Sequence, residues 1–170
     1  APVGFYSMAT RFAALPTTQL TAPMLLPIYS GLARKQDEEI HFPRSVLQVI
    51  GATCAVVTPG VILFAALSEE LVIFILGEKW RSAVPLVAPL LATIAAGVLV
   101  EPAVTTLTLR GRLKLLAALH WVAAVVVIGV MLFTARFGNI EWLAWARAVL
   151  AMLFLFLVYR WMVATLAVSW

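Results

Sequence analysis

The sequence predicts an all-α protein, a polytopic transmembrane helix bundle of about five spanning helices. Hydrophobic residues make up 64% of the 170 residues and charged residues only 12%, whereas soluble globular domains contain about half and a quarter. A soluble core cannot bury so much apolar surface, and several apolar runs are long enough to cross a bilayer. The net charge of +4 fits loop cations beside anionic lipid rather than a nucleic-acid interface.

The chain forms a single transmembrane region over residues 1–170. The expected spans are 6–29, 46–67, 83–109, 115–135 and 142–168. The first span is interrupted by prolines and by a polar group near its middle, which a membrane helix tolerates where neighbouring helices or water satisfy the released backbone groups. We therefore expect a broken helix that faces a cavity, with Pro16, Pro23 and Pro27 as its breaks and Thr17, Thr18, Gln19 and Thr21 as its polar group.

Arg11 stands about one turn inside the first span. A long cationic side chain at this depth either reaches back to the membrane surface or points into a polar cavity. The polar group further along the same helix would give a cavity-facing Arg11 a continuous hydrophilic face. The sequence leaves both orientations open.

The connections between the first three spans differ in character. Residues 31–45 form a water-soluble loop that carries both charge signs. Residues 68–82 contain an apolar run too short to cross the membrane, flanked by charges and by Trp80, so we expect this segment to extend the second helix outward or to lie on the membrane surface. Gly77 is the expected helix stop.

Glu101 is the one carboxylate within the third span, directly before Pro102. At the helical rise it lies about 13 Å from the basic cluster that begins at Arg110, which is a costly position for a charge. Such a group is protonated, paired or turned toward a protein or water-filled interior, and Pro102 frees a backbone carbonyl one turn earlier. Glu101 and Pro102 are therefore candidate coupling or gating residues, with a hydrogen-bonded packing role for Glu101 as the alternative.

The last two spans carry ionisable residues near their ends. His120 lies close to the basic end of the fourth span, where an interfacial position is expected over a proton relay. Arg147 lies about one turn inside the fifth span and is expected to extend to the interface. The interfacial aromatics of this span are Trp142, Trp145, Trp161 and Trp170.

The distribution of cations among the loops predicts the orientation. The first and third loops carry Arg34, Lys35, Arg44, Arg110, Arg112 and Lys114, and the second and fourth carry Lys79, Arg81 and Arg136. The positive-inside rule then places the N-terminal end outside and the C-terminal end in the cytoplasm.

The sequence contains no motif of a known catalytic or metal site. A Gly-rich phosphate loop, a nucleophile elbow, an HExxH pair and carboxylates at glycosidase spacing are all absent, and the lone Cys54 lies in an apolar run. We therefore expect a transporter rather than an enzyme, with no catalytic residue, no metal and no cofactor other than H⁺ or Na⁺ used for coupling.

Four stretches carry a family resemblance. In order they are GFYSMATRFAALP, LPIYSGLARKQDEE, LVIFILGEKWRSAVPLVAPL and a final TLRGR, of which GEKW, residues 77–80, is the most specific. This order resembles the C-terminal part of the lipopolysaccharide and exopolysaccharide flippases of the multidrug/oligosaccharidyl-lipid/polysaccharide exporter superfamily. The resemblance implies part of one lobe of a two-lobe transporter in the bacterial inner membrane, with further N-terminal helices and other polysaccharide-assembly proteins as partners.

The resemblance also implies the cargo and its contacts. A lipid-linked oligosaccharide carried on undecaprenyl pyrophosphate would cross by alternating access, and Arg11 matches a position where arginine would contact the phosphate. Thr17, Thr18, Gln19 and Thr21 would face the cargo path, while the coupling role of Glu101 is our own inference. The alternatives are a multidrug exporter of the same superfamily, a membrane-embedded glycan ligase or polymerase, and a non-transporting assembly scaffold.

Overall fold

A computed structural model describes residues 2–20, 30–31, 34, 41–136 and 140–167. Within these residues the fold is all-helical, and no strand is present, so the predicted fold class is confirmed. The elements in chain order are α1 (Pro2–Leu20), α3 (His41–Ala66), α4 (Ser68–Leu76), the short 3₁₀ helix η1 (Glu78–Ala83), α5 (Val84–Leu109), α6 (Leu113–Ala135) and α7 (Ile140–Ala167).

Four stretches of the described residues are long and apolar enough to cross a membrane. They are His41–Ala66, Glu78–Leu109, Leu113–Thr134 and Ile140–Leu166. Helix α1 is not among them, and residues 21–29 of the expected first span lie outside the described part of the chain. The protein is therefore a multi-pass membrane protein, and the first expected span, residues 6–29, stays a prediction.

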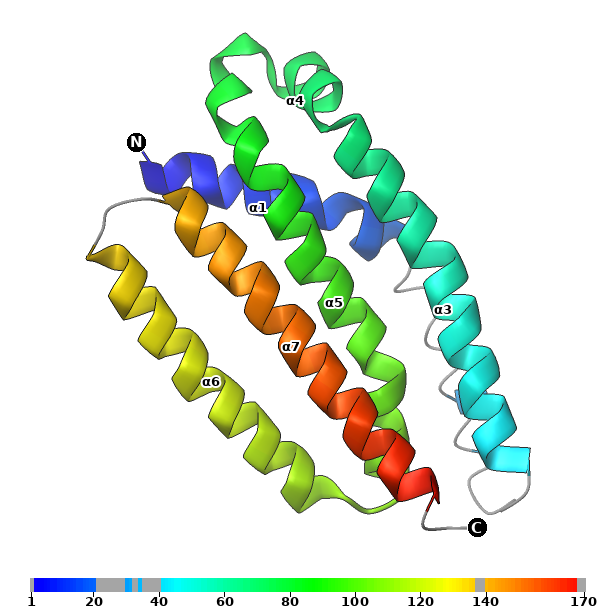
Figure 1. The fold of residues 1–170 in the computed structure, drawn as a ribbon. Coiled ribbons are helices and arrows are strands. Elements are labelled where there is room, and N and C mark those ends of the chain that lie inside the picture. Colours follow the sequence, from blue (N-terminus) through cyan, green and yellow to red (C-terminus); the bar gives the residue numbers. More distant parts are fainter. Residues whose placement is uncertain (1, 21–29, 32–33, 35–40, 137–139, 168–170) are drawn as a thin grey trace.

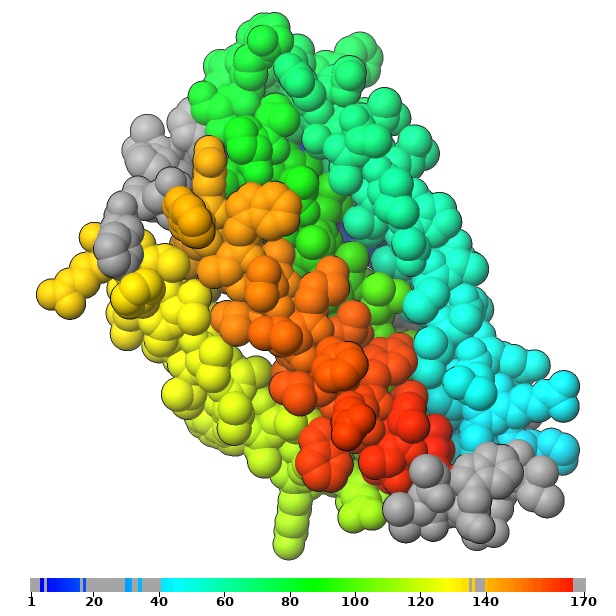
Figure 2. Space-filling model, in the orientation of Figure 1, coloured from blue at the N-terminus to red at the C-terminus, as the bar shows by residue number. Residues whose placement is uncertain are grey.

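Helix α5 is the centre of the bundle. It contacts α1, α3, α6 and α7, and half of its most apolar window is buried inside the protein, whereas only 6% of the corresponding window of α6 is buried. Figure 1 shows α3, α5, α7 and α6 side by side, with α1 passing behind and across them. Helix α6 flanks the row, and Figure 2 shows it largely open to the surroundings.

Two apolar clusters hold the helices together, one toward each end of α5. The first joins α1, α4, η1 and the beginnings of α5 and α7, through Ala9, Phe12, Ala13, Val72, Ala83, Leu86, Val87, Leu90, Leu91 and Ala144. The second joins the opposite ends of α3, α5 and α7 with the start of α6, through Phe42, Val46, Val100, Ala103, Leu107, Leu116, Val158, Met162 and Leu166. Helix α1 therefore belongs to the core only along the first half of α5.

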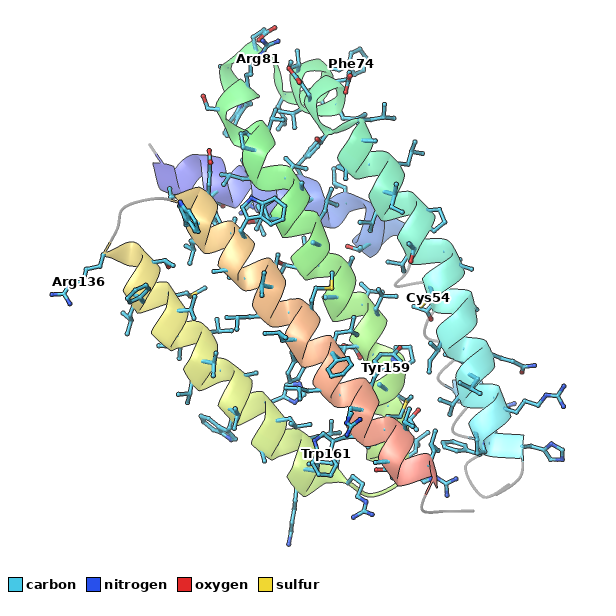
Figure 3. All side chains as sticks on the ribbon, in the orientation of Figure 1. Cys54, Phe74, Arg81, Arg136, Tyr159 and Trp161 are labelled. Atoms are coloured by element: carbon cyan, nitrogen blue, oxygen red, sulfur yellow. The ribbon has the colours of Figure 1, made fainter. Side chains whose placement is uncertain are left out.

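The segment between α3 and α5 leaves the helix row at Gly77. This glycine ends α4 with a φ of 90°, a left-handed conformation that costs glycine little and other residues more, and the predicted helix stop is thereby found. Beyond it, Arg81 forms ion pairs with Glu78 at 3.2 Å and Glu69 at 3.7 Å. Figure 3 shows Arg81 and Phe74 projecting outward at this end of the protein.

Among the described residues, the two ends of the bundle differ in charge. The end formed by the start of α3, the α5–α6 turn and the end of α7 carries, among the described residues, cations and no carboxylate: Arg44, Arg110, Arg112, Lys114 and Arg160. The opposite end, formed by α4, η1 and the α6–α7 connection, carries both signs: Glu69, Glu70, Glu78 and Glu141 with Lys79, Arg81 and Arg136.

Candidate functional site

Arg11 lies on the face of α1 that points away from the other described helices. Ala9, Phe12 and Ala13 are buried against α5, whereas Arg11 is exposed together with Leu15, one turn further on. The guanidinium makes no hydrogen bond or ion pair to any described residue. In the described part of the chain, its charge is therefore unpaired on the outer side of α1.

The polar group predicted beside Arg11 is only partly described. Thr17 is 5% exposed, and its hydroxyl donates to the backbone carbonyl of Ala14 at 2.9 Å. It shares the packed face of α1 with Ala13, so it does not extend the exposed face of Arg11. The side chains of Thr18 and Gln19, and Thr21 altogether, lie outside what the structure describes.

Glu101 is exposed, although its neighbours Val100 and Pro102 are buried. Helical spacing places Glu101 in line with Leu90 and Ile94, which belong to the cluster that α1 covers. Glu101 therefore lies on the same face of α5 as the residues that pack near α1, but further along the helix than the part that α1 covers. The exposed or half-exposed residues of this stripe are Gly97, Glu101, Thr105 and Thr108.

Arg11 and Glu101 are not brought together. The apolar cluster that α1 and α5 share reaches Ile94 on α5, and Glu101 lies seven residues further along, about 10 Å at the helical rise. Arg11 also points to the outer side of α1, away from α5. The two charges therefore lie on one side of the bundle without contact, and neither has a charged partner in the described part of the chain.

Pro102 lies inside α5 and is buried. Its ring nitrogen cannot donate to the carbonyl one turn earlier, at Val98. Two hydroxyl groups hydrogen-bond close to this break: Thr106 donates to the carbonyl of Pro102 at 2.8 Å, and Tyr159 of α7 donates to the carbonyl of Leu99 at 2.9 Å. The proline break in α5 is therefore held by side chains of α5 and α7.

Arg147 has a partner that the sequence did not indicate. Its Nη1 donates to the hydroxyl oxygen of Tyr6 at 2.8 Å, which joins α7 to α1. The side chain also lines a cavity of about 340 Å³ between α5, α6 and α7. A charged residue within a spanning helix often marks a functional site. This rule applies to Arg147 as it does to Glu101, so the position of Arg147 inside the fifth expected span could have marked it as a candidate.

Arg110 is a second cation whose environment the sequence left open. Its guanidinium carbon lies 4.6 Å from the ring centroid of Phe42, the distance of a cation–π contact. Two of its nitrogens, Nε and Nη2, are buried without a hydrogen-bond partner.

Among the described residues, no group of three or more His, Cys, Asp or Glu residues gathers to hold a metal ion.

A family model described as "Polysaccharide biosynthesis protein" matches residues 1–85, half of the chain. The chain belongs to this family. The chain is also similar to the teichuronic acid biosynthesis protein TuaB of Bacillus subtilis (strain 168), with 26% identity over 164 residues that cover 95% of the chain. The flippase-like resemblance seen in the sequence is confirmed at this level.

The chain spans about a third of the length of this relative, because the match covers 33% of TuaB. No solved structure matches the chain. The family match includes α1 with Arg11 and the GEKW segment at residues 77–80, while Glu101 and Arg147 lie beyond the matched residues.

Proposed function

We propose that this polysaccharide biosynthesis protein is part of an inner-membrane flippase that moves lipid-linked oligosaccharide or polysaccharide precursors across the bilayer by alternating access. The family and the similarity to TuaB support a role in polysaccharide assembly. The helices long enough to span a membrane support transport over chemistry at a soluble site. The protein would act without catalysing a covalent step.

The observation that carries the proposal is the exposure of Arg11 on the outer side of α1. Among the described residues Arg11 has no acidic partner, and an unpaired guanidinium attracts an anion, since its planar fork fits phosphate oxygens. The pyrophosphate of an undecaprenyl-linked glycan has that chemistry. Arg11 would contact the pyrophosphate, and Thr18, Gln19 and Thr21 would lie along the cargo path, whereas the buried Thr17 would not.

Glu101 is the proposed coupling or gating residue. Its carboxylate lies on the open part of the α1-facing stripe of α5, one residue before the Pro102 break. A carboxylate there can bind H⁺ or Na⁺, and the break gives α5 a point at which its two halves can move. The further N-terminal helices and other polysaccharide-assembly proteins would complete the path.

The distribution of lysine and arginine between the two ends supports an orientation. The cationic end, with Arg110 and Arg112, would face the cytoplasm, and the end with Glu78 and Arg81 would face the periplasm. The N-terminal end of α1 is then periplasmic and the end of α7 cytoplasmic.

The test uses cells that lack the gene and are complemented with the full-length protein or its variants. The lipid-linked glycan pool is measured by mass spectrometry and assigned to a membrane face. We expect undecaprenyl-linked units to accumulate on the cytoplasmic side without the gene. Arg11→Ala should lower export about tenfold, which is the loss of one charged hydrogen bond, and Glu101→Gln should lower it as well.

Matched controls separate these effects from loss of folding. Leu15→Ala changes the same exposed face of α1 without removing a charge, and Thr108→Val changes the stripe of Glu101 without removing its carboxylate; both should export normally. Wild-type export by Arg11→Ala and Glu101→Gln together would refute the assignment of the site. An unchanged glycan pool with raised drug sensitivity would instead identify a multidrug exporter.

A further inference from the structure

A cleft runs between α6 and α7 on the side of the bundle away from α3. It has a volume of about 340 Å³, and Figure 2 shows the two helices separating along it. Apart from Thr93 and Arg147, the lining side chains are hydrophobic: Leu119, Val122, Ala123, Val126, Val127, Leu150, Ala151, Leu153, Phe154 and Leu157. Val122, Val126, Leu153 and Leu157 are also exposed, so the cleft opens toward the surrounding lipid.

The cleft has one polar end. The hydroxyl of Thr93 is satisfied within α5, because it donates to the carbonyl of Pro89 at 2.9 Å. Arg147 uses one donor for Tyr6, and a guanidinium has five. In the described part of the chain the ion pairs involve Arg81, so the positive charge of Arg147 has no carboxylate partner there.

The length and depth of the cleft match one leaflet. On α7 it runs from Arg147 to Leu157, ten residues or about 15 Å along the helix, which is half of a hydrocarbon core of about 30 Å. The exposed Trp145 and Trp142 precede Arg147 by two and five residues, about half a turn and one and a half turns. Since tryptophan favours the membrane interface, Arg147 lies at the shallow end of the cleft, close to headgroup level.

We propose that this cleft binds a membrane phospholipid of the leaflet at the α7 N-terminal end, with the lipid phosphate on Arg147 and one acyl chain along α6 and α7. The phosphate neutralises the guanidinium, and the chain fills an apolar space open to the bilayer. A phospholipid fits better than a long polyprenyl cargo because the cleft spans about one leaflet. It is also separate from the proposed cargo contact, because Arg147 contacts α1 at Tyr6, whereas Arg11 points to the outer side of α1.

The test measures lipid retention by the purified full-length protein with native mass spectrometry. The probes are phosphatidylglycerol and undecaprenyl phosphate, added to delipidated protein. We expect Arg147→Gln to weaken phosphatidylglycerol binding about tenfold, since a charge-assisted contact is lost. Ala123→Leu should weaken it similarly by filling the cleft, and Ala151→Leu does the same from α7 if the first variant folds poorly.

Two matched variants serve as controls. Arg136→Gln removes a cation at the same end that Figure 3 shows projecting away from the bundle, and Ala124→Leu makes the same change as Ala123→Leu on an exposed position outside the cleft. Both should bind phosphatidylglycerol like the wild type.

Three results would overturn the proposal. They are equal binding by Arg147→Gln and wild type, stronger retention of undecaprenyl phosphate than of phosphatidylglycerol at this cleft, and absence of any retained lipid because another helix of the full-length protein fills it. None of these results bears on Arg11, so a failed lipid site leaves the flippase proposal to its own test.

Discussion

The hydroxyl of Tyr159 on α7 donates to the backbone carbonyl of Leu99 on α5 at 2.9 Å. Leu99 follows Val98, the residue whose carbonyl loses its helical donor at Pro102. Figure 3 shows Tyr159 projecting from α7 toward α5. The side chain of Tyr159 therefore connects α5, beside its proline break, to α7, the helix against which α5 packs most.

Removing this hydroxyl should destabilise the fold measurably. We expect Tyr159→Phe to lower the free energy of unfolding by about 1 kcal/mol, in the range of hydrogen bonds between membrane helices. The measurement is reversible unfolding of the purified protein in mixed detergent micelles. Phe156→Leu, on an exposed position of the same helix, is the control, and an equal loss in both variants would show that the hydrogen bond does not matter.

The contact between Arg147 and Tyr6 should couple α7 to α1. A double-mutant cycle of Tyr6→Phe and Arg147→Gln should give a coupling free energy of about 1 kcal/mol. Unfolding of the two single variants and the double variant supplies the cycle. Tyr6→Phe combined with Arg136→Gln should be additive, because Arg136 lies at the surface beyond α6, and coupling of similar size there would contradict the assignment.

The packing contact between α1 and α5 should not tolerate a larger side chain. Ala13 is fully buried in the first apolar cluster, so Ala13→Leu should destabilise the protein by about 1–3 kcal/mol through overpacking. Thermal unfolding in detergent measures the change. Ala52→Leu makes the same substitution on an exposed position of α3 and should be neutral within about 0.5 kcal/mol; a neutral Ala13→Leu would mean that α1 packs elsewhere.

The orientation can be tested with single cysteines in a Cys54→Ala background. A membrane-impermeant maleimide should label Lys79→Cys in intact spheroplasts and Lys114→Cys only after permeabilisation, since the cationic end is expected in the cytoplasm. Blotting for the attached label gives the result. The reverse pattern would invert the proposed topology.

Hydropathy was sufficient to find the long helices because lipid requires a continuous apolar run and internally bonded backbone. The expected 83–109 segment is α5, Val84–Leu109, and 115–135 is α6, Leu113–Ala135. Helix α3 begins at His41, earlier than the expected residue 46, because Phe42 and Val46 pack in the second apolar cluster. Hydropathy reports lipid contact and cannot report such packing.

The side-chain partners could not be predicted in the same way. The sequence placed Thr17 on the face of Arg11, but six residues along a helix turn the side chain by about 120°, and Thr17 is buried while Arg11 is exposed. Arg147 was expected to extend to the interface, but no pattern in the sequence indicated that its guanidinium also contacts Tyr6. The helix that packs next to α7 is determined by tertiary packing, and the periodicity of residues within one helix does not predict its neighbours.

The Arg147–Tyr6 contact also constrains how the protein is made. Its partners are 141 positions apart in the chain, so a ribosome working at about 5–20 residues per second needs roughly 7 to 28 seconds to supply the second partner after the first. During that interval α1 has already left the ribosome and lacks one of its anchors. Synthesis of α7 therefore completes this contact, and a nascent chain stopped before α7 should remain open to proteolysis at α1.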